Sequence, residues 1–368
     1  MNESGRGPGT NLFELNQIAM REFFSAMAEQ PYRATQVMKW IYHQGITDIA
    51  QMTDLGKMLR RRLPETLYFK LPVIVSERKS NDGTCKWVMQ VDDNNCVETV
   101  FIPEKERGTL CISSQVGCPL DCSFCATGKQ GFNRNLTVAE IIGQLWLANR
   151  ALGYFEHRTR IITNVVLMGM GEPLLNFDNV VCATDLMMDD LGFNLSHKRI
   201  TLSTAGVVPA IDKLAATRRL SLAVSLHAPT DELRNSLVPI NRRYPIKQLL
   251  AACRRYSRAN DGDPITFEYV MLKGINDSKA QATRLAGILE GIPAKINLIP
   301  FNPFPGSGYT SPARKTIDQF RDILMAAGHI TITRKTRGDD IDAACGQLVG
   351  KVTPRAKRIQ DRMEKGWI

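Results

Sequence analysis

One short run of the sequence, Cys118-Pro119-Leu120-Asp121-Cys122-Ser123-Phe124-Cys125, holds three cysteines whose spacing limits the folds available to the chain. A structural zinc site or an ordinary cubane cluster is completed by four protein ligands. No fourth cysteine follows within the next fifty residues. The triad therefore leaves one metal position open for a substrate, and Phe124 offers apolar cover for a cluster. A partial zinc knuckle or chance clustering is the alternative.

The cysteine spacing resembles the signature of the radical S-adenosylmethionine (SAM) superfamily. That resemblance implies a [4Fe-4S] cluster held by Cys118, Cys122 and Cys125. It also implies that the amino and carboxylate groups of SAM chelate the fourth iron.

Composition sets the broad class. The 368 residues suffice for one large domain and a smaller one. Lys and Arg number 47 against 37 Asp and Glu, a formal charge of +10, which favours a nucleic-acid partner but also fits a solvated basic surface. Nine cysteines, a polar start and the lack of a signal peptide or long apolar run predict a reducing cytoplasm and no membrane.

The chain divides by periodicity into four parts. Apolar residues at helical spacing over 12–27, 33–42 and 54–63 predict an N-terminal helical accessory domain, and the basic run ending in Arg60-Arg61-Arg62 is either a solvated face or an RNA contact. Alternating runs from Val73 to Ile102 predict a short antiparallel sheet leading into the cluster domain. The expected boundaries are 1–72 for the helical domain, 73–103 for the sheet extension, 104–345 for the core and 346–368 for a basic tail.

Within the core, strand-like runs alternate with helix-like ones, which predicts an α/β fold: a partial (β/α)6 TIM-type radical SAM barrel with its site at the C-terminal ends of the strands. The expected strands are 110–114, 163–168, 199–203, 221–226, 266–271 and 295–300. The expected helices are 138–149, 207–217, 246–259 and 280–289.

Polar or glycine-rich residues come directly after most of these strands, where a barrel would bring them together. They are the cysteine loop, the run Gly169-Met170-Gly171-Glu172-Pro173, and Ser203, Ser225, Leu226, His227 and Asn302. Gly171 and Glu172 resemble the superfamily's glycine-glycine-glutamate-proline motif, with Met170 in place of one glycine. We expect these residues to bind SAM, although each alone also fits an ordinary loop or strand-end cap.

Longer motifs extend the resemblance. The runs Gly108 to Cys118, Gly128 to Leu136, Met168 to Pro173 and Arg334 to Leu348 are similar to those of the RlmN/Cfr family of RNA methyltransferases. That resemblance implies methylation of C2 of adenosine in 23S rRNA near the peptidyl-transferase centre and in tRNA beside the anticodon. C2 is electron-poor and does not attack the methyl of SAM, so radical chemistry is required.

The resemblance also implies three catalytic roles and two SAM molecules per turnover. One SAM methylates Cys345. A second, reduced by an electron donor, yields a 5′-deoxyadenosyl radical that activates this methyl for addition to C2, which joins the RNA covalently to Cys345. Glu98 then takes the C2 proton, and Cys111 releases the product by forming a disulfide with Cys345. Local pattern alone makes Glu98 an exposed strand residue and Cys111 a buried inert thiol.

Two alternatives stay open. A Cfr-type enzyme would methylate C8 of adenosine, and a non-catalytic iron–sulfur RNA-binding ribosome factor would leave SAM intact.

Overall fold

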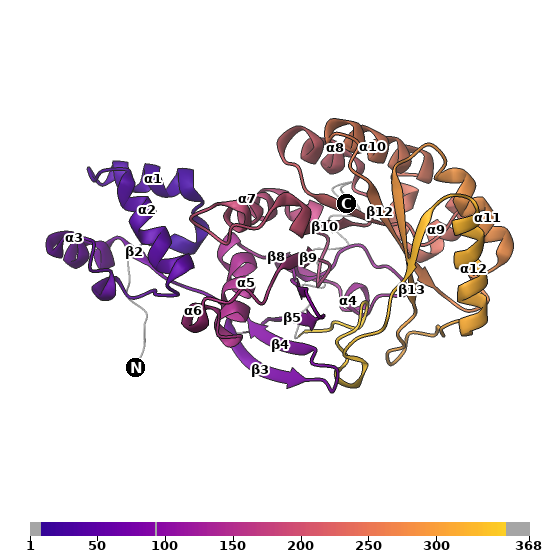
Figure 1. Ribbon diagram of the computed structural model, residues 1–368, viewed down its shortest axis with the longest axis horizontal. Helices are drawn as coiled ribbons and strands as arrows, with labels where there is room; N and C mark the ends of the chain where they lie inside the picture. Colours follow the sequence, from indigo (N-terminus) through magenta and orange to yellow (C-terminus); the bar gives the residue numbers. More distant parts are fainter. Residues whose placement is uncertain (1–8, 93, 351–368) are drawn as a thin grey trace.

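The structure is a computed structural model that describes residues 9–92 and 94–350. Its centre is a curved parallel sheet with helices on its outer side (Figure 1). The parallel strands, in spatial order, are β14 (Ile330–Thr333), β13 (Ala294–Pro300), β12 (Ile265–Met271), β11 (Ser221–Ser225), β10 (Ile200–Thr204), β9 (Asn164–Leu167) and β6 (Gly108–Cys111). The covering helices are α5 (Val138–Ala151), α7 (Phe177–Met188), α8 (Val208–Thr217), α10 (Ile246–Ala259), α11 (Lys279–Ile288) and α12 (Arg314–Ala326).

The partial barrel predicted from the sequence is confirmed, with one strand more than expected. Strand β14 pairs in parallel with β13, so the parallel part has seven strands in the described residues instead of six. It was missed because its four residues form an edge on which Ile330 and Ile332 are exposed, so no buried apolar run marks it. Helices α7 and α12, and the short α9 (Asp231–Leu237), were also missed.

The antiparallel extension is part of the barrel sheet and does not merely lead into it. Strands β3 (Val73–Lys79), β4 (Cys85–Gln90) and β5 (Cys96–Pro103) form a meander, and β5 pairs antiparallel with β6. In the described residues one sheet of ten strands results. Cys111 therefore lies inside the sheet, opposite Val100 on one side and Val166 on the other.

The N-terminal residues form a helical lobe beside the barrel (Figure 1). Its elements are α1 (Gln17–Ala26), α2 (Tyr32–Met38), α3 (Lys57–Arg62) and the two-stranded pair β1 (Thr10–Asn11) and β2 (Leu67–Tyr68). The first expected helix begins late because Leu12–Glu14 is a 3-10 turn and the side chain of Asn16 caps α1. Trp146 of α5 joins lobe and barrel, packing edge-on against Phe13 and donating to the carbonyl of Ile41 at 2.9 Å.

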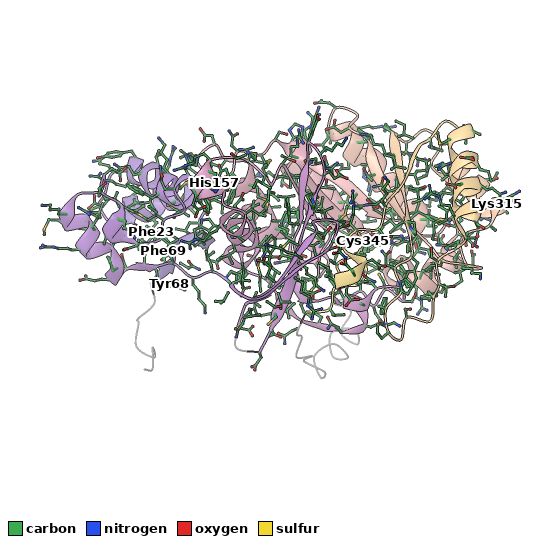
Figure 2. All side chains as sticks on the ribbon, turned by 60° about the horizontal axis from the view of Figure 1, so that its bottom comes forward. Phe23, Tyr68, Phe69, His157, Lys315 and Cys345 are labelled. Atoms are coloured by element: carbon green, nitrogen blue, oxygen red, sulfur yellow. The ribbon has the colours of Figure 1, made fainter. Side chains whose placement is uncertain are left out.

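The last described segment returns across the mouth of the barrel and carries Cys345, which lies near the middle of the molecule in Figure 2, away from Phe23 in the lobe and Lys315 on α12. The expected basic tail lies outside the described residues from position 351 onward. Among the described helices, none has both the length and the apolar character needed to cross a membrane.

Candidate active site

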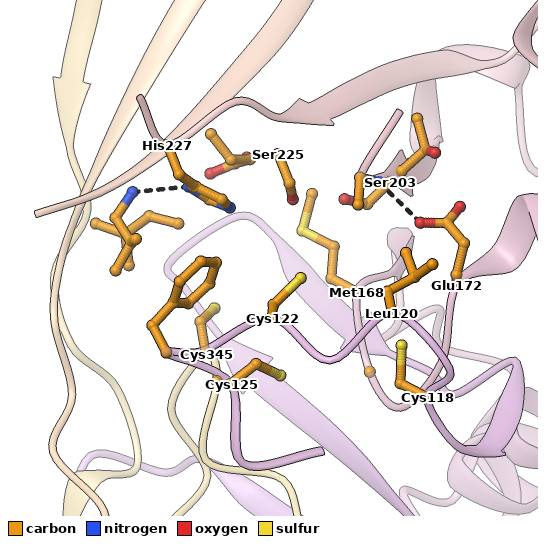
Figure 3. Close-up of a pocket in the computed structure, with 18 of the residues that line it drawn as sticks. Cys118, Leu120, Cys122, Cys125, Met168, Glu172, Ser203, Ser225, His227 and Cys345 are labelled. Atoms are coloured by element: carbon orange, nitrogen blue, oxygen red, sulfur yellow. Dashed lines mark hydrogen bonds between the residues drawn. The ribbon is translucent and has the colours of Figure 1, made fainter. Parts of the chain in front are cut away.

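The C-terminal ends of the parallel strands surround one open cavity (Figure 3). Its space, including the part open to solvent, is about 970 Å³, within the range of small-molecule sites. The sequence-predicted residues in its lining are Cys118, Cys122, Cys125, Gly171, Glu172, Ser203, Ser225, His227, Asn302 and Cys345. The prediction that the strand ends would bring the residues after them together is confirmed for all of these except Cys345, which was not expected to follow a strand.

The cysteine loop is shaped by a glycine before it. Gly117 has φ +74°, and a Cβ there would lie 1.9 Å from the carbonyl oxygen of Gly131, so only glycine fits. The loop then places three thiols along one wall of the cavity, with Leu120 and Phe124 as apolar neighbours. Burial raises the pKa of Cys118, Cys122 and Cys125, and the charge of neighbouring thiolates adds to the effect for Cys118 and Cys122.

The three thiols are the candidate ligands of an iron–sulfur cluster. Buried thiols with raised pKa values need a strong cationic partner to become thiolates. In a cubane cluster each thiolate binds a different iron, so a three-thiol loop can hold three of its four irons. Within residues 9–92 and 94–350, no three His, Cys, Asp or Glu side chains are arranged to hold one metal ion.

The loop after β9 contains the next expected cofactor residues. Gly171 has φ +100°, and a Cβ there would meet Cβ of Gln115 at 2.5 Å. Glu172 turns inward: Oε1 accepts from the N–H of Leu174 at 3.1 Å and Oε2 from that of Ala205 at 2.8 Å. Burial raises the pKa of Glu172 to about 7 despite these hydrogen bonds. Glu172 thus also fastens its own loop to the loop after β10.

Beyond β11, the structure separates residues that the sequence placed together. Ser225 and His227 line the cavity, whereas Leu226 is fully buried and is absent from the lining. Nδ1 of His227 accepts from the N–H of Val270 at 3.0 Å, so the neutral ring carries its proton on Nε2. Burial lowers the pKa of His227 to about 3. Its φ of +61° places it in the left-handed region, a strain common at functional sites.

Arg234 of α9 was not predicted as a residue of the site. It is fully buried, and its guanidinium donates to Leu226 O (3.0 Å), Asn241 Oδ1 (2.8 Å), Ala205 O (2.6 Å) and Ser225 O (2.9 Å). Burial lowers its pKa to about 10, so it stays charged at neutral pH. One cation thus fixes the backbone after two neighbouring strands, at the residues expected to meet SAM.

Cys345 and Cys111 occupy different environments near the same wall. Cys345 is exposed, and its carbonyl accepts from Nδ2 of Asn302 at 3.2 Å, so Asn302 positions the cysteine backbone. Cys111 is absent from the cavity lining, and burial raises the pKa of its thiol to about 12, with the charge of Cys345 contributing.

Glu98 departs from the local expectation, which was wrong about its exposure: the residue is buried. It does not line the cavity and instead pairs with Lys86, Nζ to Oε1 at 3.2 Å. The strand alternation did not reveal this because the residues around Cys345, including Val349, cover the face of the sheet that carries Glu98.

Two further cavity residues, Glu268 on β12 and Arg334 after β14, were not predicted. Glu268 is buried, its Oε1 accepts from Nδ2 of Asn297 at 2.9 Å, and its Oε2 is without a hydrogen-bond partner among the described residues. Burial raises the pKa of Glu268. Arg334 Nη1 lies 3.9 Å from Oε1 of Glu268, and the charge of Cys345 raises the pKa of Arg334. A glutamate within a strand carries no local signal of a site, and Arg334 stood out only as the first residue of the family-like run Arg334 to Leu348.

Comparison with known proteins agrees with this site. A family model described as the ribosomal RNA large subunit methyltransferase N-terminal domain matches residues 10–68, and one for the radical SAM superfamily matches 112–286. Proteins named dual-specificity RNA methyltransferase RlmN from Pseudomonas putida strains F1 and GB-1 are each 57% identical over 352 residues, covering 95% of this chain and 92% of theirs. The crystal structure of a radical SAM methyltransferase from Sphaerobacter thermophilus is 43% identical, with a TM-score of 0.86 over 92% of this chain and 99% of that chain.

Proposed function

The chain belongs to the RlmN family of RNA methyltransferases in the radical SAM superfamily, and on that premise we propose that it methylates C2 of adenosine in 23S rRNA and in tRNA. The cofactors of this family are a [4Fe-4S] cluster and SAM. The observation that carries the proposal is a single cavity lined both by the three-thiol loop and by Cys345 on a separate segment. A radical generator and a methyl carrier must share such a space.

The thiols of Cys118, Cys122 and Cys125 would hold the cluster, which when bound supplies the electron that cleaves SAM. Gly171 leaves room for the backbone to approach the amino-acid end of SAM, and Glu172 offers its remaining lone pairs to the ammonium group. Ser203, Ser225, His227 and Asn302 surround the rest of the cavity. Leu226 supplies only its backbone, which Arg234 holds.

Cys345 would carry the methyl group and bond to the RNA, because its exposure lets a substrate base reach it. Cys111 would then form the disulfide that releases the product. Glu98, which is paired with Lys86, would receive the C2 proton.

The RNA partner is supported by the net charge of +10 and by the ribosomal N-terminal domain model over residues 10–68. We assign residues 1–72 to RNA contact, 73–103 to the sheet extension, 104–345 to the radical SAM core and 346–368 to a basic tail. An enzyme acting on a base must take that base out of its stack. We propose that the reaction takes place in the cytoplasm, which the need for reduced thiols and for an external electron donor supports.

The deciding experiment is anaerobic reconstitution with iron and sulfide, followed by reaction with SAM, a reductant and an rRNA fragment. Digestion and mass spectrometry should yield 2-methyladenosine, with 5′-deoxyadenosine as co-product. Formation of 8-methyladenosine would assign the Cfr-type reaction instead. Intact SAM in the presence of a bound cluster would point to the non-catalytic ribosome factor.

A further inference from the structure

One buried ion pair holds the chain on both sides of Cys345. We call residues 338–349 the Cys345 segment. Lys86 on β4 and Glu98 on β5 form a salt bridge of 3.2 Å, with side chains that are each only 6% exposed. Nζ of Lys86 also donates to the carbonyl of Asp342 at 3.0 Å, three residues before Cys345. Oε2 of Glu98 accepts from the N–H of Val349 at 3.1 Å, four residues after it.

The pair is built into the sheet. Lys86 lies opposite Val100 and Val88 lies opposite Glu98, so the two charged residues are diagonal neighbours on the same face of an antiparallel pair. Two ions are costly to bury unless each is paired and its remaining hydrogen-bonding capacity is used. Here the backbone of the Cys345 segment uses part of that capacity. The charges and the segment therefore depend on one another.

We propose that Lys86 is a positioning residue of this enzyme: with Glu98 it forms an ionic latch that holds the Cys345 segment closed over the sheet. Other hydrogen bonds also hold the segment. Oγ1 of buried Thr127 donates to the carbonyl of Leu348 at 2.6 Å, Asp82 accepts from the N–H of Gly338, and Ser80 donates to Asp340 at the exposed rim. Lys86 and Glu98 differ from these because they are a buried ion pair whose charges bind the segment on both sides of Cys345.

The latch also suggests how the segment is released, a part that rests on the proposed function. When Glu98 accepts the C2 proton, its carboxyl becomes neutral and loses its ion pair with Lys86. The hydrogen bond from Val349 weakens in the same step, since a neutral acceptor is poorer than an ionised one. The hold of the ion pair on the segment is then weakened at the stage when Cys345 must bond to Cys111. No further reactant is needed, because the proton comes from the substrate.

The test is hydrogen exchange of the cluster-loaded full chain, without SAM or RNA, read by mass spectrometry in peptides covering the Cys345 segment. Lys86→Met should speed exchange there by about ten- to a hundredfold, the range for a lost charge-assisted hydrogen bond. Glu98→Gln, a neutral isostere of the protonated carboxyl, should do the same. Lys79→Met is the matched control, because Lys79 pairs with Glu77 in an exposed position on the same hairpin.

A double variant distinguishes the loss of the latch from misfolding of the sheet. Lys86→Met alone leaves the Glu98 charge buried and unpaired, whereas Lys86→Met/Glu98→Gln removes both charges. The double variant should fold and still show fast exchange confined to the segment. Unchanged exchange in the double variant, or acceleration spread equally over β4 and β5, would overturn the proposal. Because neither SAM nor RNA is present, this result is independent of whether the proposed methylation is correct.

Discussion

The carbonyl of Ala205 accepts a hydrogen bond from the guanidinium of Arg234 at 2.6 Å, while the N–H of Ala205 donates to the carboxylate of Glu172. Two buried side chains from different loops thus bind the backbone of one residue. The loops after β9, β10 and β11 are joined through this contact, so the wall of the cavity opposite the cysteine loop behaves as one unit.

Replacing Arg234 should therefore be costly. Arg234→Met removes four hydrogen bonds to groups that stay buried, and we expect a loss of about 3–5 kcal/mol in the free energy of unfolding, measured by urea denaturation. Arg255→Met is the matched control, since Arg255 pairs with Asp212 at the surface, and its loss should stay below about 1 kcal/mol. Equal losses in both variants would contradict the structural role of Arg234.

The pKa of His227 predicts an acid-sensitive fold. Its folded value is about 3 against an ordinary 6.5, so below pH 6.5 the unfolded chain binds a proton that the folded chain does not. Stability contributed by neutral His227 is present above pH 6.5 and declines as the pH falls toward 3. Between pH 7 and pH 5 the resulting loss in the free energy of unfolding is about 2 kcal/mol. Urea denaturation at both pH values should show a weaker pH dependence in His227→Gln than in the wild type. Identical pH dependence would mean that His227 is not buried in its neutral form.

Much of the fold and of the site was predictable because parallel strands share one edge. Residues far apart in the sequence, such as Cys118, Glu172 and Ser225, needed only to follow predicted strands to be placed together. The short edge strand β14 was missed although Ile330 to Thr333 alternates two β-branched residue types, because four residues without a buried apolar run are a weak strand signal.

The missed site residues share one physical reason. Lys86, Arg234 and Glu268 are charged groups that are ordinarily exposed, and their burial depends on partners distant in sequence. A local pattern assigns such residues to the surface by default. Leu226 shows the opposite error: it sits between two cavity residues, but its own side chain packs in the core.

We expect Glu268 to lower the stability of the free protein and to strengthen the binding of SAM. The carboxylate of Glu268 is buried and Oε2 has no hydrogen-bond partner among the described residues, which is costly in the free protein, so Glu268→Gln should raise the free energy of unfolding at neutral pH. The same change should weaken SAM binding by about tenfold, because the cavity loses a charged acceptor that SAM could use. Equilibrium dialysis and urea denaturation measure the two effects. Glu290→Gln at the surface should change neither, and a Glu268→Gln variant that binds SAM normally would remove Glu268 from the site.

We expect variants of the three cluster cysteines and variants of Cys345 and Cys111 to lose different properties. Cys118→Ala, Cys122→Ala or Cys125→Ala should abolish iron binding and visible absorption after anaerobic reconstitution, since each removes a ligand. Cys345→Ala should keep the iron and lose RNA methylation. Cys111→Ala should keep the iron and accumulate protein cross-linked to RNA. Methylation of C2 by Cys345→Ala would exclude the covalent route.

The burial of Cys111 predicts which of the two cysteines moves. Its thiol is 9% exposed in the middle of the sheet, and its pKa of about 12 keeps it protonated at neutral pH. Native protein treated with iodoacetamide should therefore be labelled at Cys345 and not at Cys111, as read by peptide mass spectrometry. Cys253, on the buried face of α10 and with a pKa of about 12, is the matched control and should resist labelling equally.

Unfolding in urea should make Cys111 and Cys253 reactive together, which shows that burial and not chemistry protects them. If Cys111 reacts as fast as Cys345 in the native protein, the sheet opens at β6 and the resolving thiol can move to its partner. If it stays protected, a disulfide between Cys111 and Cys345 requires the Cys345 segment to move inward, because paired strands hold Cys111 on both sides. Lys86→Met should then speed disulfide formation under mild oxidation, whereas Lys79→Met should not.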